Sequence, residues 1–262
     1  MNRSMDGKMK VVILCGGLGT RLREETEFKP KPLVEIGGKP ILWHIMKIYS
    51  HYGYKDFVLC LGYKGHMIKD YFLKHKAMTS DFTLDVKQGK EEYHSHDTDD
   101  WHITFAETGD ETNTGGRVNR IEKYIDSDNF FLTYGDGVSD VNIQELLQHH
   151  LKNSRIATLT SIQPASRFGV IEFDATHSVN SFKEKPKLDG WINGGFFVFN
   201  KEIFRYLEGN PVLEQDPLKT LALQNQLTVY PHAGLWECMD THRDFEHLNK
   251  LWKEGKAFWK VW

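Results

Sequence analysis

Hydrophobic positions along the chain fall into two patterns: short continuous apolar runs, and longer segments in which apolar residues recur at helical spacing. The short runs are rich in β-branched and aromatic side chains and end at glycine or polar residues. This is typical of strands buried on both faces of a parallel sheet. The runs predict strands at Val11–Cys15, Phe57–Leu61, Phe130–Tyr134 and Ile156–Ile162.

The periodic segments between these runs predict helices. In Lys39–Tyr52, Pro40 suits the first helical position and Gly53 follows as a stop signal. Helices are also predicted at His66–His75 and Ile143–Lys152. Because strands and helices alternate, the pattern predicts a parallel sheet joined by crossover helices.

From Phe168 onward the pattern changes to short strands close together in sequence, as in an antiparallel meander or a mixed sheet. The predicted strands are Phe168–Phe173, Val179–Lys183 and Phe196–Phe199, and the predicted helices are Ile203–Leu207, Asp216–Gln224 and Arg243–Lys253. No linker rich in proline, glycine or serine separates the halves. We therefore expect one α/β domain over residues 1–262 with a smaller β-rich elaboration.

The segment Lys76–Trp101 is polar and predicts a solvated loop that leaves the main sheet. His94 and His96 lie there among aspartates, but no second cluster supports a metal site, and we assign the segment no chemistry. His149 and His150 predict only a helix surface.

Composition narrows the class of protein. The 262 residues are 40% hydrophobic and carry a net charge of −3, which predicts a folded core without a basic surface for nucleic acid. No apolar stretch approaches the roughly 18–20 residues of a membrane span, and Met1–Lys10 lacks the apolar centre of a secretory signal. Cys15, Cys60 and Cys238 are odd in number and far apart, which favours free thiols in a reducing compartment. We expect a cytoplasmic protein with neither a nucleic-acid nor a membrane partner.

Candidate chemistry begins where the first strand runs into Gly16-Gly17-Leu18-Gly19-Thr20-Arg21. Glycines at the carboxyl end of a buried strand let backbone N–H groups approach a phosphate, although a plain glycine turn explains the loop equally well. Leu22 stands where a dinucleotide fingerprint requires glycine, and the loop lacks the Gly-Lys-Ser/Thr ending of a Walker motif. The stiff segment Lys29-Pro30-Lys31-Pro32 can hold an ammonium against a phosphate with little loss of entropy, which favours the phosphate interpretation.

Further motifs identify a family resemblance. They are Leu14–Leu22, Lys29–Pro32, Gly37–Pro40, Gly135–Gly137, Phe182–Pro186, Asn193–Gly195 and Met239–Thr241. On these motifs, residues 10–262 resemble the sugar-phosphate nucleotidyltransferases. The resemblance is to the CTP-using branch at Ile41–Met46, Thr114–Arg117, Tyr134–Val138 and Ile192–Phe197. Cys15 replaces the alanine that the family has more often, and a small buried side chain suits both.

The resemblance implies a Rossmann-like α/β fold of the nucleotide-diphospho-sugar transferase type, with a mixed, mostly parallel sheet flanked by helices. It implies a nucleotide-binding core at residues 10–163. Residues 164–262 are then expected to bind the sugar phosphate and to take part in a homo-oligomer.

The reaction implied by the resemblance is attack by glucose 1-phosphate on the α-phosphorus of CTP, giving CDP-glucose and pyrophosphate for deoxysugar or O-antigen-type polysaccharide synthesis. Two polyanions must meet, so positive charge and Mg²⁺ matter more than a side-chain nucleophile. By resemblance, Asp136 and Asp240 hold Mg²⁺. Arg21, Lys31 and Asp136 are the predicted catalytic residues, with Lys31 on the α-phosphate and Arg21 on the phosphates that depart.

The other substrate contacts are also carried over from the family. Lys185 is expected to bind the phosphate of the sugar substrate, and Asn193 a sugar hydroxyl. The full set of predicted substrate-binding positions is Leu14, Cys15, Gly16, Gly17, Leu18, Gly19, Thr20, Arg21, Lys31, Thr112, Arg117, Gly135, Lys185 and Asn193.

Three other interpretations stay open from the sequence. The same chemistry could use another sugar 1-phosphate, or UTP or dTTP in place of CTP. A homologue could bind sugar nucleotide without turnover, since a fold does not determine a function. A dinucleotide-binding oxidoreductase is disfavoured by Leu22.

Overall fold

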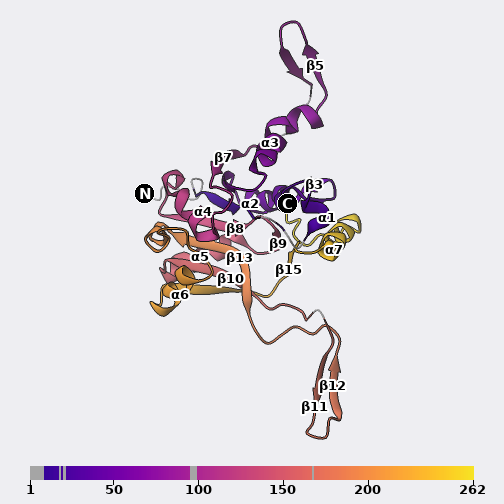
Figure 1. The fold of residues 1–262 in the computed structure, drawn as a ribbon, viewed down its shortest axis with the longest axis vertical. Coiled ribbons are helices and arrows are strands. Elements are labelled where there is room, and N and C mark those ends of the chain that lie inside the picture. Colours follow the sequence, from indigo (N-terminus) through magenta and orange to yellow (C-terminus); the bar gives the residue numbers. More distant parts are fainter. Residues whose placement is uncertain (1–8, 18, 20–21, 95–98, 167) are drawn as a thin grey trace.

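A computed structural model describes residues 9–17, 19, 22–94, 99–166 and 168–262. At its centre lies a seven-stranded sheet with the strand order β14-β10-β13-β8-β1-β4-β7 (Figure 1). In this sheet β13 is antiparallel to both of its neighbours and every other pair is parallel. The sheet is therefore mixed and mostly parallel, which confirms the predicted fold class. Its strands are β1 Val11–Leu14, β4 Asp56–Leu61, β7 His102–Glu107, β8 Asn129–Tyr134, β10 Ala157–Ile162, β13 Ile192–Asn200 and β14 Leu227–His232.

Helices cover both faces of the sheet because successive strand residues point to opposite sides. In β1, Val11 and Ile13 pack into one core cluster with residues of α2, α5 and α7, whereas Val12 and Leu14 pack into another with residues of α4 and α6. The α-helices are α1 Arg23–Thr26, α2 Ile41–His51, α3 Gly65–Thr79, α4 Thr114–Arg120, α5 Ile143–Asn153, α6 Asp216–Leu223 and α7 His242–Lys253. The 3-10 helices are η1 Lys31–Leu33, η2 Glu122–Tyr124 and η3 Lys201–Tyr206.

The carboxyl edge of the parallel strands gathers the predicted motifs. Leu14 at the end of β1 is in register with Tyr134 at the end of β8, so the glycine loop and Gly135–Gly137 leave the sheet side by side. Because β13 runs in the opposite direction, its first residues, including Asn193, lie at this same edge. An open α/β sheet binds its ligand at this edge.

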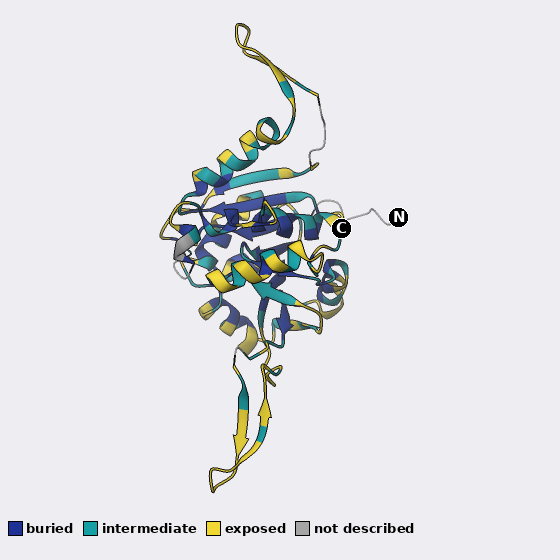
Figure 2. Cartoon of the chain, turned by 90° about the vertical axis from the view of Figure 1, so that its right-hand side faces the viewer, coloured by how far each residue is buried: buried dark blue, intermediate teal, exposed yellow. Residues whose placement is uncertain are grey.

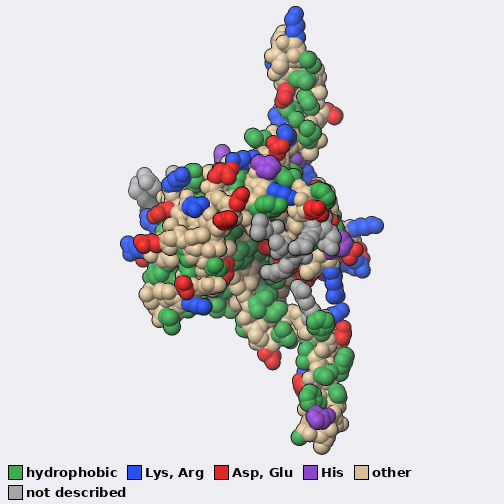
Figure 3. All heavy atoms as spheres, in the orientation of Figure 1, with side chains coloured by type: hydrophobic (Ala, Val, Ile, Leu, Met, Phe, Trp, Pro, Cys, Tyr) green, Lys and Arg blue, Asp and Glu red, His purple; other side chains and the backbone are tan. Residues whose placement is uncertain are grey.

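Two hairpins project from opposite ends of the body (Figure 1). The first arm, residues 80–94, carries β5 Phe82–Asp85 and β6 Lys90–Tyr93. The second arm, residues 164–191, carries β11 Val170–Phe173 and β12 Val179–Lys183. Both arms are largely exposed (Figure 2), and hydrophobic side chains are visible along them (Figure 3).

Several local predictions need correction. The helix predicted from Lys39 begins at Ile41, because Lys39–Pro40 forms strand β3 and pairs with β2, Glu35–Ile36. The predicted strand Phe196–Phe199 belongs to β13 in the central sheet, whereas Phe168 is 77% exposed on the second arm. The loop predicted at Lys76–Trp101 does leave the sheet, but it contains the paired strands of the first arm.

The predictions for the histidines and the cysteines can also be compared with the structure. His150 is buried rather than on the helix surface, with Nδ1 2.8 Å from Thr158 Oγ1. His94 contacts Thr83, and His96 lies outside the described residues. All three cysteines are free, as predicted. Within the described part of the chain, no helix has the length and hydrophobicity needed to cross a bilayer.

Candidate active site

The glycine loop after β1 is held against the sheet. Cys15 N donates to the carbonyl of Cys60 at 3.0 Å, and Thr26 Oγ1 donates to the carbonyl of Gly19 at 2.9 Å. Gly19 has a φ of +64°, a conformation that favours glycine. Of the predicted loop positions, Leu18, Thr20 and Arg21 lie outside the described residues.

Arg117 braces this loop from inside the protein. Its buried guanidinium donates to five acceptors at 2.7–3.1 Å, which are the carbonyls of Gly16, Leu61, Gly109 and Asp110 and the hydroxyl of Thr108. A Cβ on Gly16 would lie 2.2 Å from Arg117 Nη1, so only glycine fits there. Arg117 borders the cavity, and its hydrogen bonds tie the glycine loop to the loop after β7, whereas its role in binding substrate stays a prediction.

Lys31, Asp136 and Asp240 meet in one cluster. Lys31 Nζ lies 2.6 Å from Asp136 Oδ2 and 2.6 Å from Asp240 Oδ1. Burial alone would lower the pKa of Lys31, but the charge of Asp136 and hydrogen bonds to both carboxylates outweigh it and raise the pKa above its ordinary value. The ammonium therefore stays charged between the two carboxylates.

Local structure explains why these three groups converge. Lys31 lies in the single turn η1, between the fixed φ angles of Pro30 and Pro32. Asp136 follows β8, and Asp240 follows β15, Trp236–Cys238. The strand β9, Gly137–Ser139, pairs antiparallel with β15, and Met239 N donates to the Asp136 carbonyl at 2.9 Å. This pairing brings the two carboxylates together.

The donor set of the cluster fits a hard divalent cation. Ligand atoms of Asp136, Cys238 and Asp240 all lie within 4.8 Å of one another. Burial and the charge of Asp136 raise the pKa of the Cys238 thiol well above its ordinary value, so the thiol keeps its proton and the oxygen donors of the set are those of Asp136 and Asp240. Oxygen donors of this kind suit Mg²⁺, which commonly takes one or two protein carboxylates.

A cavity of about 530 Å³ opens in front of the glycine loop. Its walls include the predicted residues Leu14, Cys15, Gly16, Gly17, Gly19, Lys31, Thr112, Arg117, Gly135, Asp136 and Asp240. Gly135 is required by a close approach, because a Cβ there would lie 2.8 Å from the carbonyl of Leu14. The sequence therefore predicted most of this wall.

A second cavity of about 840 Å³ lies on the other side of Asp240, which borders both cavities. Lys185, Lys187 and Arg243 supply positive charge to its lining. Lys185 and Asp240 both border this cavity, and the binding of a sugar phosphate by Lys185 stays a prediction. The amide of Asn193 is turned to the protein instead, accepting from Gly195 N at 2.9 Å and donating to Tyr134 Oη at 3.3 Å.

Some residues that border the two cavities were not predicted from the sequence. Tyr134 and Val212 border the first cavity, and Arg243 borders the second. Val212 and Arg243 lie in segments without a recognised motif, so only their place in the fold reveals them. Tyr134 does lie within a motif, but its hydrogen bond to Glu214 could not be read from the sequence.

Comparison with known proteins agrees with this geometry. The profile of the family described as Nucleotidyl transferase matches residues 10–250. A glucose-1-phosphate cytidylyltransferase from Salmonella typhi is 50% identical over 257 residues, covering 97% of this chain and 100% of that protein. The protein of the same name from Salmonella typhimurium is also 50% identical over 257 residues, with the same coverage. Among solved structures, HddC from Yersinia pseudotuberculosis superposes with a TM-score of 0.68 at 24% identity, covering 93% of this chain and 99% of that one, which is a likeness of fold.

Proposed function

This chain belongs to the nucleotidyl transferase family, and from that premise we propose that it transfers the cytidylyl group of CTP to α-D-glucose 1-phosphate, giving CDP-glucose and pyrophosphate. The proposal is supported by 50% identity to glucose-1-phosphate cytidylyltransferases over nearly the whole chain.

The observation that carries the proposal is the place of Asp240 between two cavities. The glycine loop borders the first cavity and suits a nucleoside triphosphate. The cationic side chains that border the second cavity suit a sugar phosphate. Lys31 and Asp136 lie at the same boundary, within 2.6 Å contacts. Two phosphorylated substrates entering from the two sides would meet at this cluster.

In the proposed reaction, a phosphate oxygen of glucose 1-phosphate attacks the α-phosphorus of CTP. The new P–O bond forms as the bond to the β-phosphate breaks, and pyrophosphate leaves. Lys31 holds its ammonium against the α-phosphate, where negative charge develops, and Lys185 orients the attacking phosphate. Arg21 is proposed to bind the phosphates that depart.

Asp136 and Asp240 are proposed to hold Mg²⁺, since an oxygen of each lies within 4.8 Å of the other. When bound there, the ion supplies charge neutralisation to the phosphate oxygens. Lys31 Nζ contacts an oxygen of both carboxylates, so cation binding between them requires the ammonium to move toward the substrate.

Three further proposals concern the protein in its cell. The exposed apolar residues of both arms suit contacts between copies of this chain in a homo-oligomer. The free thiols suit a reducing, cytoplasmic setting. A CDP-glucose product suits later steps that modify the sugar, as in deoxysugar synthesis for a surface polysaccharide.

The test is pyrophosphate release by the purified protein with glucose 1-phosphate and Mg²⁺, offering CTP, UTP, dTTP, ATP and GTP separately. We expect strong release with CTP and at most a few per cent of that rate with the others. Release with another nucleotide alone would replace the proposed base, and release with none would contradict the proposed reaction.

A further inference from the structure

The loop Asp110–Thr114, here called the nucleotide loop, forms one wall of the 530 Å³ cavity. It connects β7 to α4, and its residues Asp110 to Thr114 all border the cavity. Loops of this kind move unless other groups hold them. What holds this loop therefore decides how well the cavity is formed before a nucleotide enters.

A segment distant in sequence, Asn210–Glu214, braces the nucleotide loop. Asn113 N donates to Asn210 Oδ1 and Asn113 Nδ2 donates to the Asn210 carbonyl, both at 2.8 Å. The two segments approach so closely that a Cβ on Gly116 would lie 2.2 Å from Asn210 Oδ1. The close contact with Asn210 therefore depends on the absence of a side chain at Gly116, in the first turn of α4.

Glu214 connects the nucleotide loop to the central sheet. Its Oε2 accepts from Thr114 Oγ1 at 2.7 Å, and its Oε1 accepts from the Tyr134 hydroxyl. Leu213 N donates in turn to Thr114 Oγ1 at 2.9 Å. One carboxylate therefore satisfies a hydroxyl from the loop and a hydroxyl from the sheet.

Tyr134 is the rigid end of this connection. It is the last residue of β8, which pairs with β1 on one side and with β13 on the other. A Cβ on Gly195 would lie 2.5 Å from the Tyr134 ring, so the ring packs closely against the backbone of β13. If the connection were cut, the loop would keep its contacts with Asn210 and Arg117.

We propose that Glu214 is a positioning residue that holds the nucleotide loop in its binding conformation through Thr114 and Tyr134, and thereby sets the affinity and base selectivity for the nucleotide. The inference rests on the proposed function, because it takes the 530 Å³ cavity as the CTP site. Glu214 itself lies outside that cavity lining, so its effect passes through the loop.

The test compares Glu214→Gln with Glu208→Gln. Glu208 is exposed on the preceding segment, so the second variant removes the same charge at a site away from the cavity. We expect Glu214→Gln to raise the KM for CTP about tenfold, since hydrogen bonds to a charged group are lost, while the KM for glucose 1-phosphate changes less than twofold. The ratio of kcat/KM for CTP over UTP should fall, and Glu208→Gln should match the unmodified protein.

A second pair of variants removes the other end of one hydrogen bond. Thr114→Val loses the hydroxyl and should reproduce the rise in KM for CTP, whereas Thr114→Ser keeps it and should restore most of the affinity. Calorimetric titration with CTP and Mg²⁺ gives the same comparison without turnover. This pair decides the question if Glu214→Gln fails to fold.

Two results would overturn the inference. One is an unchanged KM for CTP in both Glu214→Gln and Thr114→Val. The other is an equal rise for both substrates with a lower melting temperature, which marks a general structural role. An unmodified protein that neither binds nor turns over CTP would instead overturn the proposed function, so the two failures are distinguishable.

Discussion

Lys31 spans the two carboxylates at the boundary of the cavities, with 2.6 Å to an oxygen of each. Its neighbour Lys29 is more exposed and pairs with Glu35 at 3.4 Å, away from the cluster. Two lysines of one Lys-Pro-Lys-Pro segment thus have different surroundings. This difference makes Lys29 a matched control for Lys31.

Lys31→Ala is expected to lower kcat on the order of 100-fold, with a smaller change in KM for CTP, because charge on the α-phosphate develops in the transition state. Lys29→Ala should change both constants less than threefold. Steady-state kinetics of pyrophosphate release check this. A rise in KM for CTP with unchanged kcat would show instead that Lys31 contributes to binding CTP in the ground state.

Asp136→Asn and Asp240→Asn should each lower turnover on the order of 100-fold and raise the Mg²⁺ concentration needed for half-maximal rate, because each removes one anionic ligand. A Mg²⁺ titration of the pyrophosphate-release rate measures both effects. Near-normal rates in both variants at the Mg²⁺ concentration used for the unmodified protein would show that these residues are not metal ligands.

At the scale of elements, the glycine loop depends on what lies behind it. A Cβ on Gly16 would collide with Arg117, whose guanidinium is bound to five acceptors and can move aside only by giving up some of these hydrogen bonds. A Cβ on Gly17 would meet nothing within 4 Å. The two neighbouring glycines therefore have different structural roles.

Gly16→Ala should lower the melting temperature by about 5 °C, since overpacking a tight site costs on the order of 1–3 kcal/mol. Gly17→Ala should stay within about 1 °C of the unmodified protein. Thermal unfolding followed by circular dichroism provides the comparison. Equal melting temperatures for the two variants would show that Arg117 can move aside.

Helix α2 is joined to the C-terminal segment through His44, which is fully buried. Its Nδ1 accepts from Trp259 Nε1 at 3.2 Å, and its Nε2–H donates to the carbonyl of Ile36 at 2.9 Å. Burial lowers the pKa of His44 from 6.5 to about 4. The ring is thus neutral in the folded protein at pH 7.

The folded pKa of His44 lies below its unfolded value, so the unfolded chain binds the extra proton first. Stability from this residue is complete above about pH 6.5 and is lost as the pH falls toward about 4. At pH 5 the loss amounts to about 2 kcal/mol. Urea unfolding at pH 7 and pH 5 should show this loss, and His44→Gln should show a smaller one. Equal losses in both proteins would assign the pH dependence to other groups.

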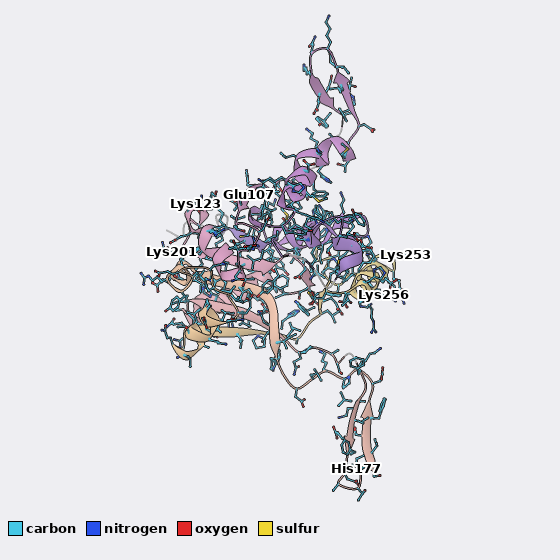
Figure 4. All side chains as sticks on the ribbon, in the orientation of Figure 1. Glu107, Lys123, His177, Lys201, Lys253 and Lys256 are labelled. Atoms are coloured by element: carbon cyan, nitrogen blue, oxygen red, sulfur yellow. The ribbon has the colours of Figure 1, made fainter. Side chains whose placement is uncertain are left out.

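At the scale of the whole molecule, the two arms stand away from the body (Figures 1 and 2). Their exposed side chains include Val86 at 84% on the first arm and Phe173 and Val179, both at 58%, on the second. His177 marks the far tip of the second arm (Figure 4). An exposed apolar surface of this kind marks an interaction site.

We therefore expect a homo-oligomer by light scattering. Because Phe173 and Val179 are paired across the second arm, Phe173→Ser combined with Val179→Ser should lower the mass or shift dissociation to higher protein concentration. Leu223→Ser, at an 89% exposed position on α6, is the control and should leave the mass unchanged. A monomeric mass for the unmodified protein would contradict the expectation.

Some strands and helices are determined by residues that lie close together in the sequence, and local patterns alone predict these elements. The apolar runs gave β1, β4, β8 and β10 within about one residue of the observed bounds, and the glycine loop and the lysine-proline segment border the 530 Å³ cavity. These features follow from side-chain periodicity and from the fixed φ of proline, which act over a few residues. The family motifs added the carboxylates, and their roles as ligands stay predictions.

Tertiary structure alone decided which distant segments meet. The pairing of β9 with β15 brings Asp136 to Asp240, and the insertion of β13 between β8 and β10 places Asn193 at the edge of the sheet. Local patterns in the sequence also give no indication of β7 and β14, or of a role for Glu214. The physical reason is that strand pairing and side-chain contacts between distant segments depend on the packing of the whole chain, which local periodicity does not record.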